Sequence, residues 1–182
     1  TVDAIPGRLA FTLKYPNQEV QASLNDCLLR QFTGDAAVSE PQVSRLWRVL
    51  QSGDVAALRD LFHAFFANIP NDWYRNSPIA QFEGYWASVF YSHFAALGLD
   101  IRVEDTTNKG RIDMAVLAGG AAWLFEFKVV ELVPAGRALQ QIKARGYADK
   151  YRSRGEPIHL IGVEFSRADR NIVGFEVERI DP

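Results

Sequence analysis

Two strand-like segments on either side of a Gly-Gly dipeptide restrict the possible folds of this sequence more than any of its other features. The segments are residues 111–117 (RIDMAVL) and 122–130 (AWLFEFKVV), joined through Ala118-Gly119-Gly120-Ala121. A two-residue hairpin turn needs positive φ angles, which glycine adopts freely. A turn at Gly119 and Gly120 would set Asp113 opposite Glu126 and Arg111 opposite Lys128.

The charged residues of this hairpin fall on one face of the predicted sheet. Side chains alternate between the two faces of a strand, so Asp113, Glu126 and Lys128 are predicted to point the same way. Directly opposed side chains have Cβ atoms roughly 5 Å apart, and two carboxylates at that range repel unless a cation lies between them. Mg²⁺ and Mn²⁺ prefer such oxygen ligands.

Two interpretations of these charges remain open from the residues alone. In the first, Asp113 and Glu126 hold a metal ion, and Lys128 orients or deprotonates an attacking water or stabilises a pentavalent phosphate. In the second, Asp113, Glu126, Lys128 and Arg111 form a cross-strand salt bridge. The apolar neighbours in residues 124–127 predict a largely buried strand, where charges without partners are costly.

The pattern along the chain changes from helices to strands, which predicts an α/β fold. A first helix is predicted over residues 19–32, and a second begins at the capping sequence Ser39-Glu40-Pro41-Gln42. A third is predicted over 55–67 with Asp54 as its cap, and a fourth over 79–97, where Gly98 ends it. Further strands are predicted over 100–104, 158–165 and 172–180, and a helix over 134–151. We therefore expect an all-helical segment over residues 1–71 and an α/β domain over residues 72–182.

Composition places the chain among ordinary globular proteins. Its 182 residues are 48% hydrophobic and 23% charged, and Cys27 stands alone, which excludes an internal disulfide or a multi-cysteine zinc site. No apolar run approaches the roughly 18 residues of a membrane span. We expect a soluble cytoplasmic protein with no membrane partner. Because the chain begins with Thr1 and not methionine, we also expect it to be part of a longer protein.

Charge is unevenly distributed, although the net charge is only −2. Residues 137–154 hold six basic side chains against Asp149, a local charge of about +5. The basic residues are Arg137, Lys143, Arg145, Lys150, Arg152 and Arg154. This stretch is predicted to bind a phosphate backbone, and the alternative is a solvated helix face. Phosphate-loop, dinucleotide-binding and His-Glu-x-x-His motifs do not occur in the sequence.

The motif order resembles a known family. Asp113, a gap of 12 residues and then Glu126-Phe127-Lys128, between a predicted helix with Glu83 and one with Gln141, is similar to the core of the PD-(D/E)XK nuclease superfamily. Gly110-Arg111-Ile112-Asp113 and residues 138–147 resemble the branch that follows an AAA-ATPase-like half in prokaryotic proteins. Residues 11–28 are similar to the connector before that nuclease. Ile112 stands where the motif's name has proline.

The resemblance implies a restriction-endonuclease-like core, in which a central mixed β-sheet is flanked by helices, and a nuclease that acts on nucleic acid, with DNA expected. The cofactor would be Mg²⁺ or Mn²⁺, and an AAA-ATPase-like domain would be a partner in the full-length chain. The implied catalytic residues are Glu83, Asp113, Glu126, Lys128 and Gln141, with Asp113, Glu126 and Glu83 as metal ligands. The implied nucleic-acid-binding residues are Arg111, Lys143, Arg145, Lys150 and Arg152. The alternative is a catalytically silent module that binds nucleic acid or regulates the attached ATPase.

Overall fold

The computed structural model describes residues 36–69, 81–131 and 134–182, and nearer the N-terminus residues 2–5, 8–11, 16–17, 19–20, 23–24 and 27. A five-stranded mixed sheet has the order β3-β4-β5-β6-β7 and is antiparallel except between β5 and β6. Its strands are β3 (Asp100–Thr107), β4 (Gly110–Ala118), β5 (Ala121–Val130), β6 (Ile158–Ser166) and β7 (Asn171–Ile180). All five predicted strands are therefore confirmed.

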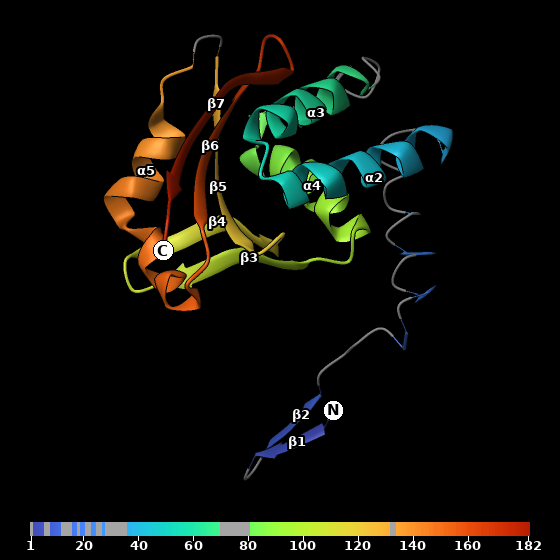
Figure 1. Ribbon diagram of the computed structural model, residues 1–182, viewed down its shortest axis with the longest axis vertical. Helices are drawn as coiled ribbons and strands as arrows, with labels where there is room; N and C mark the ends of the chain where they lie inside the picture. Colours follow the sequence, from blue (N-terminus) through green and yellow to red (C-terminus); the bar gives the residue numbers. More distant parts are fainter. Residues whose placement is uncertain are drawn as a thin grey trace.

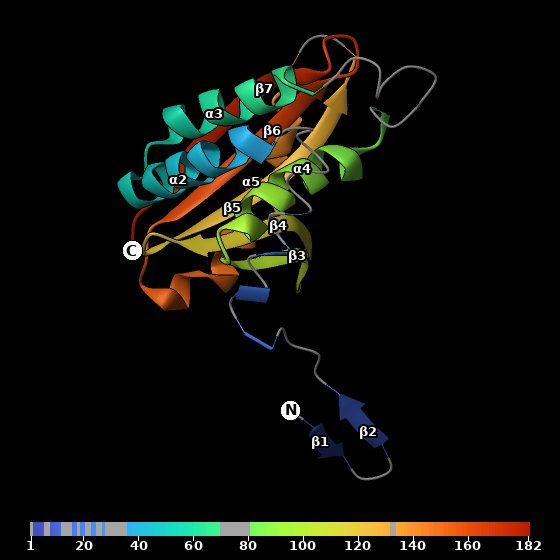
Figure 2. The same cartoon turned by 90° about the vertical axis from the view of Figure 1, so that its right-hand side faces the viewer.

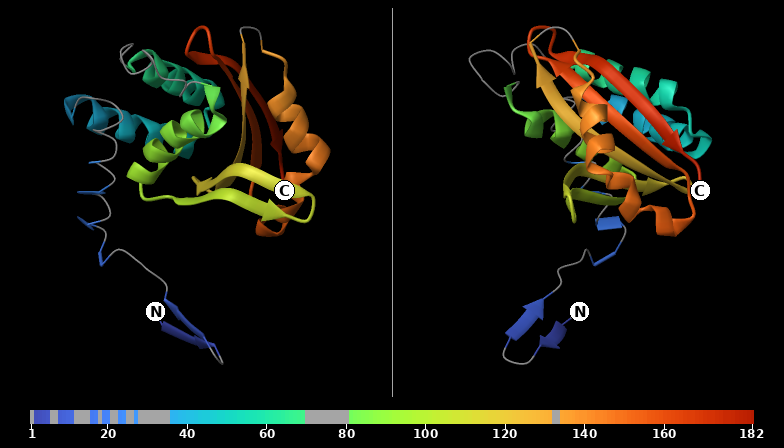
Figure 3. Two further views of the ribbon diagram at one scale, coloured as in Figure 1. Left: turned by 180° about the vertical axis from the view of Figure 1, so that it is seen from behind. Right: turned by 90° about the vertical axis from the view of Figure 1, so that its left-hand side faces the viewer.

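Helices cover both faces of the sheet (Figure 1). The helices α2 (Ala36–Ser52), α3 (Val55–Ala67) and α4 (Glu83–Ala96) lie on one face, and α5 (Arg137–Arg145) lies on the other. Within the first layer, α3 contacts β7 and α4 contacts β3, β4 and β5 (Figure 2). The helix α5 packs against β5 and β6 (Figure 3). The predicted α/β class, a central mixed sheet flanked by helices, is confirmed.

From Ala118 to Met114 the hairpin between β4 and β5 has the predicted register, but the predicted pairs of Asp113 with Glu126 and of Arg111 with Lys128 lie beyond its ladder. Gly119 and Gly120 adopt φ angles of 63° and 68°, and the ladder runs from Ala118 opposite Ala121 to Met114 opposite Phe125. Alternation along β5 sends Phe125 and Phe127 into the core under α2, α3 and α4, while Leu124 packs under α5. Because both faces of the sheet are covered, β5 is buried over most of its length.

The helical layer and the sheet share one hydrophobic core. Phe62 of α3 stacks on Phe90 of α4 with ring centroids 3.7 Å apart, and Trp86 stacks on Phe165 of β6 at 4.7 Å. His93 is buried against Phe65, and His159 stacks on Trp123. The predicted division between residues 1–71 and 72–182 lies in a segment outside the described residues, and the core includes side chains from both sides of it.

Three predicted helix boundaries are wrong. The helix predicted over 134–151 ends at Arg145, because Gly146 adopts a left-handed φ of 59°, and the short 3₁₀ helices η3 (Tyr147–Lys150) and η4 (Arg152–Arg154) follow. The helix α4 begins at Glu83, after extended backbone at Phe82, so the described part of the predicted start at residue 79 is not α-helical. The helix α2 begins at Ala36, ahead of the predicted cap at Ser39.

The N-terminal segment is not all-helical as predicted. The strands β1 (Val2–Ile5) and β2 (Arg8–Phe11) pair antiparallel, with Ile5 opposite Arg8. The Pro6-Gly7 dipeptide between them is typical of turns and was the signal for this hairpin. Of the helix predicted over 19–32, the described residues 19, 20, 23, 24 and 27 are helical, and the others lie outside the described residues. No helix of the described part is long and apolar enough to cross a membrane.

Candidate active site

The candidate site lies at the end of the β4–β5 ladder, where a side-chain hydrogen bond replaces the backbone pairing. Backbone pairing extends as far as Met114 and Phe125. One position further along β4, the Oδ2 atom of Asp113 accepts a hydrogen bond from the backbone N–H of Phe127 at 2.8 Å. This bond holds the Asp113 carboxylate against β5, next to Glu126. Burial raises the pKa of Asp113 above its ordinary value, although the hydrogen bond from Phe127 opposes the shift.

Glu126 is a fully buried carboxylate, with 0% of its surface exposed. Its Oε1 atom accepts hydrogen bonds from the Nζ of Lys128, at 3.2 Å, and from the Nε2 of Gln141 on α5. Its Oε2 atom is buried without a hydrogen-bond partner among the residues that the structure describes. Burial, and then the negative charge of Asp113, raise the pKa of Glu126 from 4.5 to about 7. Within the described part of the chain, this oxygen thus has no hydrogen-bond donor.

Lys128 lies between two carboxylates. Its Nζ is 3.2 Å from Glu126 Oε1 and 3.6 Å from Glu83 Oε2, and it also donates to the backbone oxygen of Phe127 at 3.0 Å. Burial by itself would lower the pKa of Lys128, but the attraction of Glu126, Glu83 and Asp113 outweighs burial and raises it. The side chain therefore stays a cation at neutral pH.

The two helical layers supply the other members of the cluster. Glu83 is the first residue of α4, where the free N–H groups of the helix favour a carboxylate, and its side chain is 47% exposed. Gln141 lies on α5, on the opposite side of the sheet, and reaches Glu126 from there. Glu83, Glu126, Lys128 and Gln141 are thus in direct contact as a chain of hydrogen bonds and ion pairs, with Asp113 close beside them.

A cavity of about 470 Å³ adjoins this cluster between α4 and the strands β3 and β4. Glu83 and Asp113 both line it. Arg111 lines it as well, but forms an ion pair with Glu104 at 3.2 Å and not with the carboxylates of the cluster. The four-residue cross-strand salt bridge considered from the sequence is therefore replaced by ion pairs of Lys128 with Glu126 and Glu83.

The predicted metal ligands Glu83, Asp113 and Glu126 are not grouped around one point in the structure. In the described part of the chain, no three His, Cys, Asp or Glu side chains are grouped as a metal-binding set. Lys128 separates Glu83 from Glu126, since its Nζ contacts both. The assignment of Glu83, Asp113 and Glu126 as ligands stays a prediction.

Comparison with known proteins assigns the chain to a family. A family model described as the PD-(D/E)XK nuclease superfamily matches residues 81–175. This range begins two residues before α4 and ends within β7. The chain belongs to the PD-(D/E)XK nuclease superfamily. The sheet of mixed direction with helices on both faces is the restriction-endonuclease-like architecture of that superfamily, as predicted.

A curated relative of the chain is an uncharacterised protein in the 5′ region of vnfD in Azotobacter chroococcum mcd 1. It is 60% identical over 179 residues, which cover 98% of this chain. The chain spans only 35% of the relative's length. The superfamily match covers residues 81–175 and leaves α2 and α3 outside it.

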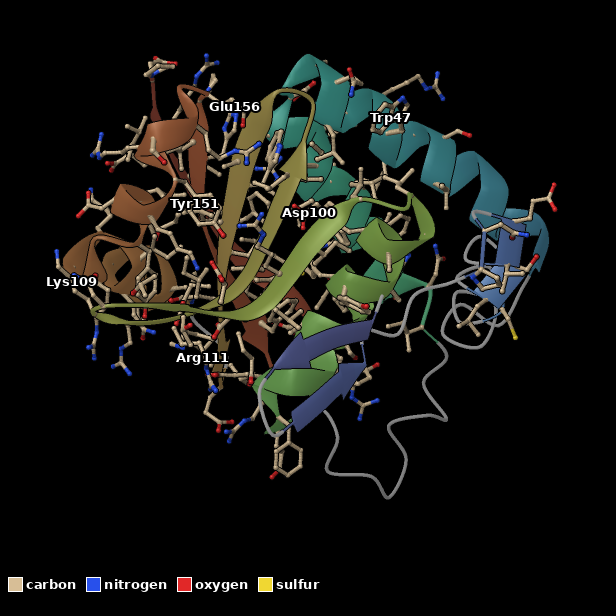
Figure 4. The ribbon with its side chains drawn as sticks, turned by 90° about the horizontal axis from the view of Figure 1, so that it is seen from below. Trp47, Asp100, Lys109, Arg111, Tyr151 and Glu156 are labelled. Carbon is tan, nitrogen blue, oxygen red and sulfur yellow. The ribbon has the colours of Figure 1, made fainter. Side chains whose placement is uncertain are left out.

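Several basic residues of the stretch 137–154 contact acidic side chains or backbone oxygens in the structure. Lys143 forms an ion pair with Glu178 of β7 and Lys150 with Asp105 of β3, both at 2.5 Å. Arg152 pairs with Asp149 at 3.2 Å. Arg145 donates to the backbone oxygen of Lys109, at the tip of the hairpin between β3 and β4 (Figure 4). Glu178 and Asp105, which lie on strands, therefore offset two of the positive charges in the local value of about +5.

Sequence reasoning missed Glu164, a buried carboxylate of β6 with 2% of its surface exposed. It stands opposite Lys128 in the parallel ladder and accepts hydrogen bonds from backbone N–H groups at the start of α5. A single charge within the apolar strand of residues 158–165 was the signal that could have identified it. Asp105 was also missed. It accepts a hydrogen bond from the Tyr151 hydroxyl at 2.6 Å, joining β3 to the layer that contains α5.

Proposed function

We propose that the chain is a metal-dependent nuclease that hydrolyses phosphodiester bonds, with DNA as the expected substrate and Mg²⁺ or Mn²⁺ as cofactor. The observation that carries the proposal is the buried Oε2 atom of Glu126, which has no partner among the described residues and lies beside a second carboxylate, Asp113. A buried carboxylate in this state is costly unless a cation or a proton compensates it. Superfamily membership supports the proposal independently.

The residues present fit a hard divalent cation. Asp113 and Glu126 would hold it, with Glu83 as a further carboxylate on the side of the cavity. One or two carboxylates are enough for Mg²⁺, because the ion keeps several waters and takes an oxygen of the substrate phosphate. When bound, such an ion neutralises charge on the phosphate and lowers the pKa of a coordinated water.

Lys128 and Gln141 would act on the substrate and on the carboxylates. Since the pKa of Lys128 is raised, the ammonium group is suited to orient the attacking water and to stabilise negative charge on the phosphate. Removal of a proton from water would require the neutral amine, so we assign Lys128 the electrostatic role. Gln141 would fix the Oε1 atom of Glu126, so that its Oε2 atom stays directed at the cation.

We also propose that basic residues contact the nucleic-acid backbone. They are Arg111 and four residues of the stretch 137–154. Arg111 lies two residues from Asp113, at the rim of the cavity. The others are Lys143, Arg145, Lys150 and Arg152. The acidic partners of Lys143 and Arg152 are exposed, so phosphate oxygens can replace them as partners in a complex. We also propose that an AAA-ATPase-like domain accompanies the chain in the full-length protein, because residues 110–113 and 138–147 resemble the branch that follows such a domain and the chain spans 35% of its relative's length.

The test is a cleavage assay on the purified chain. Supercoiled, linear and single-stranded DNA and RNA would each be incubated with Mg²⁺, with Mn²⁺ or with a chelator. We expect cleavage only with metal, its loss in Asp113→Asn, and its retention in Asp60→Asn, an exposed carboxylate on α3. A folded chain that is stabilised by metal but cleaves none of these substrates would favour the catalytically silent alternative.

A further inference from the structure

The cavity beside the carboxylates has a lining that the cleavage chemistry does not explain. Its apolar side chains include Ala87 and Tyr91 of α4, Val103 of β3 and Phe127 of β5. Tyr91 and Val103 leave 41% and 54% of their surfaces exposed. Large apolar side chains gathered around a cavity next to an active site are typical of a surface that contacts a ligand.

Where no metal ion neutralises them, the carboxylates of the cavity disfavour a phosphate group as its occupant. Glu83, Asp113 and Glu104 line it with carboxylates, and its lining cation, Arg111, is paired with Glu104 at 3.2 Å. A phosphate would be repelled by this set, whereas a flat, uncharged group with N–H donors would find both apolar walls and carboxylate acceptors. Among the parts of a nucleic acid, only the nucleobase has this chemistry.

The backbone at the rim of the cavity departs from regular strand geometry. Glu104 has a φ of 51° within β3, a left-handed conformation that is costly for a residue with a side chain. The ladder between β3 and β4 pairs Val103 with Met114 and Asp105 with Ile112, and passes over Glu104 and Asp113 between them. The strand is therefore distorted at the level of Asp113, where Glu104 meets Arg111. Strain of this kind concentrates at binding and catalytic sites.

We infer that this cavity receives an unpaired nucleobase of the substrate, while the adjacent phosphate lies at Asp113 and Glu126. The inference rests on the proposed nuclease function and names its substrate class, a single-stranded or locally unpaired nucleic acid. The volume of the cavity, about 470 Å³, lies within the usual range for small-molecule pockets, about 300–1,000 Å³. A base in an intact duplex is stacked and paired, so it could enter only after extrusion from the helix.

Nucleic-acid binding measured in the presence of a chelator tests the nucleobase site independently of cleavage. Fluorescence anisotropy would compare the affinities for a labelled single strand, a full duplex, and the same duplex with one bulged nucleotide. We expect the single strand and the bulged duplex to bind about tenfold or more tightly than the full duplex, because stacking one base on an aromatic side chain is worth a factor of that order. Ala87→Phe, which fills the cavity, should abolish this preference.

A second variant keeps the test decisive if the larger side chain disturbs folding. Tyr91→Ala removes the exposed ring at the cavity and should weaken binding of the single strand about tenfold. Trp47→Ala is the matched control, since Trp47 is an exposed aromatic of α2 that does not line the cavity, and its affinity should equal that of the parent.

The outcomes distinguish the two proposals. Equal affinity of the parent for all three nucleic acids, unchanged by Ala87→Phe and Tyr91→Ala, would overturn the nucleobase site even if the chain cleaves DNA. A preference for unpaired substrates that the cavity variants remove would support the site even if no metal supports cleavage, and the nuclease proposal alone would then fail.

Discussion

The carboxylate of Glu164 accepts a hydrogen bond from the backbone N–H of Arg137 at 2.7 Å, although Glu164 lies on β6 and Arg137 begins α5. The same carboxylate accepts from the backbone N–H groups of Ala135, Gly136 and Ala138. The first N–H groups of a helix have no partners within it, so a buried acid from the sheet provides the cap. Gln141, which contacts Glu126, lies on this helix, so Glu164 also positions Gln141.

Replacement of this buried acid is expected to destabilise the fold. Glu164→Gln keeps the size of the side chain but removes the charge and turns one acceptor into a donor that faces N–H groups. We expect a loss of about 1–3 kcal/mol in the free energy of unfolding, the cost of unsatisfied buried polar groups. Urea denaturation measures it. Glu131→Gln, the same change at an exposed residue that follows β5, is the control, and equal stability of the two variants would contradict the capping role.

The raised pKa of Glu126 predicts a pH dependence of stability in chelator. A carboxyl group whose pKa rises from 4.5 to about 7 on folding favours the folded state when protonated. Its contribution is fully present below pH 4.5 and is lost as the pH rises to about 7. Relative to Glu126→Gln, the parent should therefore lose on the order of 2–3 kcal/mol across this window. A difference between parent and variant that stays constant from pH 4.5 to pH 8 would rule this out.

Two substitutions in the cluster should respond oppositely to metal. In chelator, Asp113→Asn should melt at the same or a higher temperature than the parent, because its amide oxygen can still accept from Phe127 while the repulsion of Glu126 is gone. It should lose the stabilisation that Mn²⁺ gives by binding the folded state. Lys128→Ala should melt lower, because Glu126 loses its cation, yet keep the shift with Mn²⁺.

Thermal melts of the parent and both variants, with and without Mn²⁺, measure this difference. If Lys128 only forms a structural salt bridge with its neighbours, both substitutions should destabilise the protein by similar amounts, and Mn²⁺ should shift none of the three melting temperatures. That pattern would refute the metal site without any need for the correct substrate.

The basic residues proposed to contact phosphates predict a change in salt dependence. A variant in which Lys143, Arg145, Lys150 and Arg152 are all glutamine should bind every nucleic-acid sequence more weakly. The slope of log K against log salt concentration should become less steep by roughly 0.9 for each lost contact to duplex DNA. The control replaces four exposed arginines elsewhere, Arg45, Arg48, Arg59 and Arg167. Equal slopes for the two variants would remove the basic stretch from the interface.

Local rules were enough to predict the hairpin that carries the site. Gly119 and Gly120 permit the two-residue turn, and the alternation of side chains in β5 then determines which residues face which layer. The helix α3 was predicted with its bounds and its cap, because the Asp54 side chain accepts from the N–H of Ala57 within one turn. These features depend on residues a few positions apart, so they can be read from sequence.

The tertiary structure decided the partners of the charged side chains. Nothing local pairs Lys143 with Glu178, Lys150 with Asp105, or the start of α5 with Glu164, since each pair joins elements far apart in the chain. The order of strands in the sheet and the placement of helices on its two faces bring such residues together. By itself, the sequence determined the strands, the hairpin register and the residue types of the site. Which charges are buried, paired or left without a partner depended on packing between distant segments, because desolvation and ion pairing act through space and not along the chain.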